Sequence, residues 1–313
     1  MRDPNGPRPI FLDPALNYIS VDNFEGLTPN EMHGLINFPF NKAQSPMILA
    51  QDLPSELIVN TPIHKKIIKY LSMVRELSPL KLTQRGNLTV SFCKELLKAG
   101  VVEAETGLLN KFDLRTMEDS YFITYMFQLT QEAGLTMTGR GKLSLTDKGA
   151  SCLDRLRPFE LYRHLFIKHC TRFNWAYSDR LAESGIIQQS FGFSILLVQR
   201  HGIEERRHLF YVQRFLKAFP EVLNDFLRSS NPGWAFEGVY TNRVIERTLE
   251  RFGLIKMWTE NRKDGRGSLK DRLMIRKTEL ADKFVKWKTV GPHLRPEDKG
   301  KFFEVGSGVQ PSS

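Results

Sequence analysis

The sequence predicts a mainly α-helical protein with small β-hairpins, in which tandem winged-helix-like modules lie around a helical middle segment. Two observations support this fold class. A helical pattern, two alternating runs around a turn and a further helix occur in this order twice, near residues 118–157 and 236–290. In addition, the phrase LKLTQRG at 80–86 returns as LSLTDKG at 143–149, which indicates a partial copy of the same scheme at 60–100.

The first segment, residues 1–60, is predicted to be irregular apart from one short helix. Thr28 stands where a helix cap belongs, and Pro29 suits the first helical position. Glu31 completes a capping box, because its carboxylate can reach back to the cap amide. The residue before Pro39 is disfavoured in a helix, so this helix must end there.

Residues 61–157 hold the partial module and the first complete one. Apolar residues recur every three or four positions after Pro62 and again from about Glu118, which predicts two helices. A further helix is expected at Thr89–Ala99. Leu80 and its neighbours alternate as in a short strand.

A β-hairpin is predicted towards the end of this segment. The runs LTMT and KLSLT alternate apolar and polar residues on either side of Gly-Arg-Gly. Thr146 follows the second run and is placed to cap the next helix.

Residues 158–229 are predicted to be buried helices, because the segment is rich in aromatic and aliphatic residues. An apolar stripe from Leu209 to Phe226 marks one helical region, which Pro220 interrupts.

Residues 230–290 repeat the helix–hairpin–helix plan. A helix is expected over Thr241–Arg251, followed by the strands LIKMWTE and RLMIRKT, and Thr278 is placed to cap the last helix. The tail, residues 291–313, is polar and rich in glycine and serine, which is typical of disorder.

Composition limits the class of protein. No stretch approaches eighteen uninterrupted apolar residues and the first residues lack an apolar signal core, so we expect no membrane segment and a cytoplasmic location. The three cysteines are scattered, which argues against a disulfide framework. No phosphate-binding loop, nucleophile elbow or zinc-protease motif is present, so the sequence indicates no catalytic residue and no cofactor.

Positive charge indicates where a polyanion would bind. The formal net charge is +10, and residues 1–60 carry only three basic against seven acidic side chains. The turn NRKDGRGSLKDR of the last module is predicted to follow a phosphate backbone. Its basic residues are Arg262, Lys263, Arg266, Lys270 and Arg272. A solvated hairpin loop is an equally ordinary explanation for such a composition.

The helix before this turn carries a second group of candidate residues. Asn242, Arg243 and Arg247 are of the types that contact base edges when a helix enters the major groove. Glu246 and Glu250 lie among the arginines, so ion pairs along a solvated helix explain the pattern as well.

A metal site is not predicted. His164, His169 and Cys170 are close in sequence, but a spacing of five residues places the two histidines on different sides of a helix.

Two segments resemble a set of uncharacterised bacterial proteins with no established activity. One is FEGLTPNEMH at 24–33, which is similar to their F-x-G-L-[ST]-P-x-x-M-H pattern. The other is LKLTQRGNL at 80–88, which is similar to L-K-x-T-x-x-G-N-L. The likeness covers residues 22–150, with Thr89 where those proteins often have proline. It implies a bacterial intracellular protein and transfers no site residue.

The sequence thus favours a non-enzymatic DNA-binding or nucleic-acid-associated protein, with duplex DNA as the expected partner of the basic turn and the helix before it. The main alternative is a protein–protein interaction scaffold built from winged-helix modules, whose partner would bind the helical middle segment. An enzyme with a site that no motif marks is the third possibility.

Overall fold

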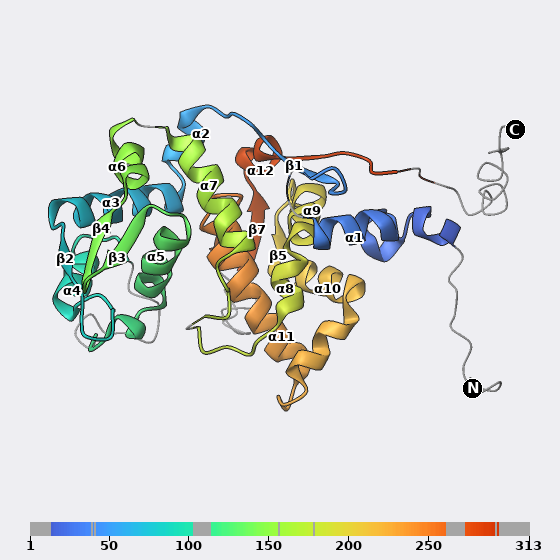
Figure 1. Cartoon of the computed structure of the whole chain (residues 1–313). Coiled ribbons are helices and arrows are strands. Elements are labelled where there is room, and N and C mark those ends of the chain that lie inside the picture. Colours follow the sequence, from blue (N-terminus) through green and yellow to red (C-terminus); the bar gives the residue numbers. More distant parts are fainter. Residues whose placement is uncertain are drawn as a thin grey trace, which may run out of the picture. The chain divides into compact units, whose positions relative to one another are not determined.

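The computed structural model describes residues 14–38, 40, 42–102, 114–155, 157–177, 179–260, 273–291 and 293 (Figure 1). The chain divides into two compact units, one made of Met1–Ile48 with Trp287–Ser313 and the other of Leu49–Lys286. The described part is mainly helical, with short antiparallel strands. Apart from residues 291 and 293, the predicted tail lies outside the described residues.

The smaller unit contains the capped helix that the sequence predicts. Its elements are the 3-10 helices η1 (Pro14–Tyr18) and η2 (Asp22–Phe24) and the helix α1 (Pro29–Asn37). Thr28 Oγ1 accepts a hydrogen bond from the Glu31 amide at 3.1 Å, and the Thr28 amide donates to Glu31 Oε2 at 3.1 Å. The capping box is therefore confirmed.

Glu31 also binds the C-terminal segment of this unit. The Val290 amide donates to Glu31 Oε1 at 3.1 Å, and His293 Nε2 lies 2.9 Å from the same oxygen. Burial raises the pKa of the Glu31 carboxyl, but the hydrogen bonds from His293, Thr28 and Val290 outweigh it, so the pKa lies below its ordinary value.

Replacing Glu31 with Gln is expected to lower the free energy of unfolding near neutral pH by about 1–2 kcal/mol, since a charged acceptor forms stronger hydrogen bonds than an amide. A carboxyl whose pKa is lower in the folded state stabilises above its unfolded pKa, and this stabilisation is lost as pH falls through the folded pKa. The difference between wild type and variant should therefore shrink below about pH 4.5. Urea titrations at several pH values measure it, and a difference that does not change with pH contradicts the assignment.

The first half of the larger unit combines short helices with one small sheet. Its elements are α2 (Ser55–Val59), α3 (Pro62–Glu76), β2 (Leu80–Lys81), α4 (Val90–Lys98), η3 (Met117–Asp119), α5 (Tyr121–Glu132), β3 (Thr136–Gly139), β4 (Lys142–Leu145) and α6 (Asp147–Asp154). These elements run from blue through cyan to green in Figure 1. The hairpin predicted around Gly-Arg-Gly is confirmed as β3 and β4.

The two copies of the repeated phrase are neighbouring strands of one sheet. The strand order is β2-β4-β3, and both pairings are antiparallel. Leu80 lies opposite Leu143 and Lys81 lies opposite Lys142. Residues 60–100 therefore do not form a sheet of their own. Their strand β2 joins the sheet of the 136–145 hairpin.

The glycines that end the two phrases have different tasks. Gly86 has a φ of +80°, and its amide donates to the Thr83 carbonyl oxygen in a tight turn. Gly149 lies in the first turn of α6, where a Cβ would be 2.0 Å from the Leu135 carbonyl oxygen. The first glycine permits a left-handed turn, and the second allows a helix to approach the main chain closely.

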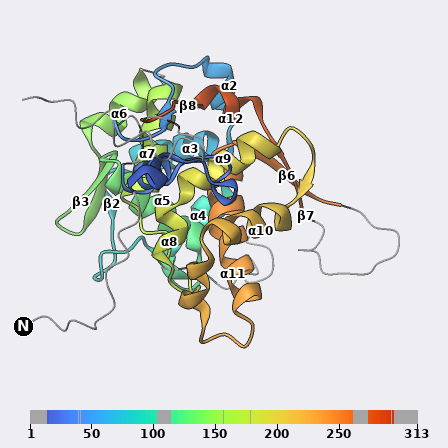
Figure 2. The same cartoon turned by 90° about the vertical axis from the view of Figure 1, so that its right-hand side faces the viewer.

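The second half of the larger unit repeats this succession after a long helix. Its elements are α7 (Pro158–Thr171), α8 (Gly185–Gln189), α9 (Phe191–His201), β5 (Arg206–Arg207), α10 (His208–Ala218), η4 (Pro220–Phe226), α11 (Pro232–Tyr240), the π-helical η5 (Thr241–Glu250), β6 (Ile255–Thr259), β7 (Leu273–Lys277) and α12 (Glu279–Phe284). The sheet order is β5-β7-β6, which corresponds strand for strand to β2-β4-β3. Figure 2 shows β6 and β7 side by side, with α10 close to them. The short β1 (Met47–Leu49) and β8 (Val285–Trp287) lie where the chain passes between the two units.

The correspondence of the halves extends to single hydrogen bonds. Gly134 and Gly253 end α5 and η5 in the left-handed conformation, with φ of 65° and 72°. The hydroxyls of Thr146 and Thr278 donate to the carbonyl oxygens of these glycines, each at 2.7 Å. Each threonine thus ties the end of a hairpin to the end of the helix before it.

The capping roles of the two threonines differ. Thr146 Oγ1 accepts from the Gly149 amide at 3.0 Å, so its predicted cap is confirmed. Thr278 makes no side-chain cap bond, and the prediction for it is wrong. The Ala281 amide donates instead to the Thr278 carbonyl oxygen at 3.1 Å, which satisfies that amide through the main chain.

Aromatic side chains form much of the core of the larger unit. Phe166 on α7 packs edge-on against Phe252 and Phe284, with ring centroids 5.2 Å and 5.0 Å away. The Tyr162 hydroxyl donates to the Phe252 carbonyl oxygen at 2.7 Å. The buried helices predicted for 158–229 are therefore present, and their aromatic residues face inward. No helix in the described part of the chain is both long enough and apolar enough to cross a membrane.

Candidate nucleic-acid interface

The basic turn predicted to contact phosphates joins β6 to β7. Arg262, Lys263, Arg266, Lys270 and Arg272 all belong to residues 261–272, which lie outside the described residues. The structure fixes the two strands from which this turn departs.

Arg243, on η5, forms a buried ion pair that the sequence does not predict. Its Nε lies 2.7 Å from Asp179 Oδ2 and its Nη2 lies 3.0 Å from Asp179 Oδ1, which is a two-pronged contact. The Arg243 side chain is 2% exposed and the Asp179 side chain is fully buried. This guanidinium is therefore held inside the unit and is not presented on its surface.

Arg247 of η5 and Arg251, the residue that follows η5, lie over aromatic rings of α5. Arg247 Cζ is 3.4 Å from the Tyr121 ring centroid, and Arg247 Nη1 is 3.4 Å from Asp179 Oδ2. Arg251 Cζ lies 4.8 Å from the Phe122 centroid and 4.6 Å from that of Tyr125. These cation–π contacts join the helix that precedes one hairpin to the helix that precedes the other.

Asn242 is partly buried, and its Oδ1 has no hydrogen-bond partner among the described residues. Of the residues predicted to read bases, Arg243 and Arg247 are engaged with the protein itself, so η5 does not offer these two arginines to a DNA groove.

His169, beside Cys170, takes a structural position. His169 Nε2 is 2.9 Å from Thr248 Oγ1, and its ring stacks on Trp175 at 5.1 Å between centroids. Burial, with a smaller effect from Arg251, holds the pKa of His169 well below its ordinary value, so the ring is neutral. Within the described ranges, no three His, Cys, Asp or Glu side chains are grouped to hold a metal ion.

The outer face of the β5-β7-β6 sheet presents two cations that are not among the residues predicted to bind nucleic acid. Lys256 on β6 lies directly opposite Arg276 on β7, and both side chains are exposed. Their neighbours Ile255 and Ile275 are buried on the other face. Neither cation has an ion-pair partner in the described part of the chain.

An aromatic and an apolar side chain continue this face towards the basic turn. Trp258 lies opposite Met274, two residues further along each strand, and both are partly exposed. Arg207 on β5 also lies opposite Met274 and is 3.8 Å from Glu260. The outer face therefore combines cations with an indole immediately before the 261–272 turn.

The corresponding sheet of the first half also places two cations together. Lys81 on β2 and Lys142 on β4 are register partners, and both are exposed. Arg140, in the turn between β3 and β4, is exposed and has a φ of 50°. This face offers no tryptophan. The β5-β7-β6 sheet therefore differs from it in presenting an indole beside its cations.

Like charges directly opposite each other on a sheet are destabilising by a fraction of a kcal/mol, on the order of 0.2–1 kcal/mol. A bound polyanion removes this repulsion. Its own condensed counterions are released at the same time, which makes binding more favourable. Aromatic side chains on the same face can stack on bases.

Comparisons with protein-family models, with curated proteins and with solved structures find no match to this chain.

The signal for the Lys256–Arg276 pair was present in the sequence. Both strands were predicted, and aligning their buried residues across the turn places these two cations opposite each other. The Asp179–Arg243 pair had no such local signal, because its members are 64 positions apart.

Proposed function

We propose that this protein is a non-enzymatic nucleic-acid-binding protein that contacts phosphates through the outer face of the β5-β7-β6 sheet and the basic turn at 261–272. The observation that carries the proposal is the exposed Lys256–Arg276 pair, two like charges held opposite each other without an acidic partner among the described residues. Trp258 on the same face provides a stacking surface.

We interpret each half of the larger unit as a winged-helix-like module. The succession of helix, strand, helices and hairpin supports this interpretation, as does the matching strand order of the two sheets. In such modules the helix before the hairpin commonly enters the major groove. Here these helices are α5 and η5, which contact each other through Arg247 and Tyr121. In this proposal the strands and the turn contact the phosphate backbone of the nucleic acid, and η5 does not read bases.

Phosphate contacts predict strong dependence on salt and weak dependence on sequence. Wild-type protein is expected to bind a short fluorescein-labelled DNA duplex with roughly micromolar affinity at low salt. The double variant Lys256→Glu/Arg276→Glu should bind more weakly, and the slope of log K against log salt should fall by about 2, since each phosphate contact contributes about 0.9. Fluorescence anisotropy measures both quantities.

A matched control is the double variant Lys94→Glu/Lys217→Glu. It changes the net charge by the same amount at two exposed helix positions, Lys94 on α4 and Lys217 on α10. This control should keep the wild-type salt slope. Equal slopes for the wild type and the Lys256→Glu/Arg276→Glu variant, or no binding by the wild type, contradict the proposal.

A protein–protein scaffold is the second candidate, and two exposed apolar residues favour it. Leu227, after η4, and Trp234, on α11, are each 69% exposed. Large apolar side chains exposed in this way are typical of interaction surfaces. A protein partner that survives nuclease treatment and is lost on replacing Leu227 and Trp234 with Ser supports this second function.

A further inference from the structure

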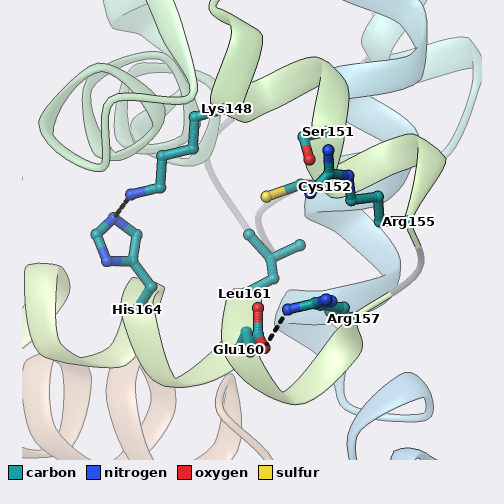
Figure 3. A pocket seen from close by; sticks show the side chains of 8 residues that line it. All are labelled: Lys148, Ser151, Cys152, Arg155, Arg157, Glu160, Leu161 and His164. Carbon is teal, nitrogen blue, oxygen red and sulfur yellow. Dashed lines mark hydrogen bonds and ion pairs between the residues drawn. The ribbon is translucent and has the colours of Figure 1, made fainter.

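A cleft between α6 and α7 lies apart from the outer sheet faces and has no role in the proposed function. It has a volume of about 190 Å³ and is lined by side chains of both helices and of the link between them (Figure 3). This is smaller than the roughly 300–1,000 Å³ of sites for drug-sized ligands. The cleft therefore suits a small molecule.

One end of the cleft is built from Lys148 and His164. Lys148 Nζ lies 2.7 Å from His164 Nε2 and 3.2 Å from the Ala133 carbonyl oxygen. An ammonium has three N–H donors and no acceptor. It donates to the Ala133 carbonyl oxygen and has further N–H donors for a ligand.

The histidine at this end is held neutral. Burial lowers the pKa of His164. The contact with the Ala133 carbonyl oxygen raises it, but burial together with the charges of Lys148 and Lys168 outweighs this effect. His164 Nε2 also lies 2.8 Å from the Ala133 carbonyl oxygen, so this nitrogen, Lys148 Nζ and the oxygen are all within hydrogen-bond distance of one another. Lys148 is thus the cation at this end, and His164 positions it.

The other end of the cleft holds two arginines and one carboxylate. Arg157 Nη1 lies 2.9 Å from Glu160 Oε1. The exposed Arg155 side chain makes no ion pair with the described residues. Together with Lys148, the lining has three cations against one acid.

Hydroxyl, thiol and apolar groups complete the lining. Figure 3 shows the Ser151 hydroxyl and the Cys152 sulfur directed towards the space between the two ends, with Leu161 on its floor. Leu161 is 3% exposed. Burial raises the pKa of the Cys152 thiol, so this group is a neutral hydrogen-bonding partner and not a thiolate.

We propose that this cleft binds the phosphoryl group of a small phosphorylated molecule. The excess of two positive charges matches a phosphoryl dianion. The Lys148 ammonium, the planar guanidinium of Arg155 and the Ser151 hydroxyl can each donate hydrogen bonds to its oxygens. Leu161 offers an apolar surface to the organic part of the ligand.

The test is a titration of the full-length protein with inorganic phosphate and with glycerol 3-phosphate, at ionic strength held constant with sodium chloride. The His164 ring signals in the NMR spectrum are the reporter, because the ring contacts Lys148. Wild-type protein should show saturable shifts with both probes and tighter binding of glycerol 3-phosphate. Arg155→Gln should weaken binding about tenfold, which corresponds to one charge-assisted hydrogen bond.

Lys94→Gln is the matched control, since it removes one exposed lysine on α4 and should leave the affinity unchanged. Shifts that do not saturate, or equal affinities of wild type and Arg155→Gln, overturn the proposal. A short 5′-phosphorylated oligonucleotide is the third probe. If it binds the cleft more tightly than glycerol 3-phosphate does, the small-molecule assignment is overturned. Lys256→Glu/Arg276→Glu should not change phosphate binding, so this test is independent of the nucleic-acid proposal.

Discussion

Replacing Asp179 with Ala is expected to lower the free energy of unfolding by about 3–5 kcal/mol, because the variant leaves the Arg243 guanidinium charged, buried and without its acidic partner. Both oxygens of Asp179 contact Arg243, and the arginine side chain is 2% exposed. Water cannot replace the lost contacts without opening the packing between η5 and its surroundings. Urea denaturation followed by circular dichroism measures the change.

Two further variants make this result specific. Asp225→Ala removes an exposed carboxylate on η4 and should change stability by no more than about 0.5 kcal/mol. Adding Arg243→Met to Asp179→Ala should restore more than half of the loss, since it removes the unpaired charge. If the free energy of unfolding of Asp179→Ala lies within about 1 kcal/mol of the wild-type value, the ion pair does not stabilise this region.

Replacing Gly149 with Ala is expected to destabilise the larger unit by about 3 kcal/mol or more, because overpacking against main-chain atoms cannot be relieved by a rotamer change. The new Cβ would lie 2.0 Å from the Leu135 carbonyl oxygen. Relief requires α6 to move away from the end of α5, which also strains the Thr146 contacts to Gly134 and Gly149. Thermal and urea denaturation measure the loss.

Gly238, inside α11, is the matched control. A Cβ there meets no atom within 4 Å. Gly238→Ala should therefore stabilise the protein by about 0.5–1 kcal/mol, as expected for a glycine in an unobstructed helix. A Gly149→Ala variant as stable as Gly238→Ala contradicts the close approach of α6 to Leu135.

Local features of this fold were predictable because their determinants are adjacent in sequence. Thr28 and Glu31 form a capping box within four residues, and the two hairpins follow from alternation on either side of a turn. The two-residue strand β5 was missed because Arg206 and Arg207 do not alternate apolar with polar residues, as Leu80 and Lys81 of the equally short β2 do. Thr278 was assigned a cap that the main chain supplies instead.

Long-range features were not predictable from these patterns. The repeated phrase indicated architecture, but not that its copies pair with each other across sixty residues to place Lys81 beside Lys142. The η5 helix has the composition of a DNA-reading helix. Its arginines nevertheless contact Asp179 and an aromatic ring of α5. Sequence composition shows which charges are present, and tertiary packing decides which of them reach the surface.

We propose that the like-charged pair on the β5-β7-β6 sheet serves nucleic-acid binding, and the single variant Lys256→Glu is a sharp test of this role. A carboxylate opposite Arg276 should raise the free energy of unfolding by about 0.2–1 kcal/mol, since it converts a repulsion into an attraction. The same variant should bind duplex DNA about tenfold more weakly at low salt. Lys94→Glu, with the same change of charge, should alter neither quantity appreciably.

Unfolding and anisotropy titrations of the same three preparations give the result. Greater stability together with weaker binding in Lys256→Glu is the expected outcome. Unchanged binding in a variant that is more stable would show that the pair has no part in nucleic-acid contact, and the proposed interface would be wrong.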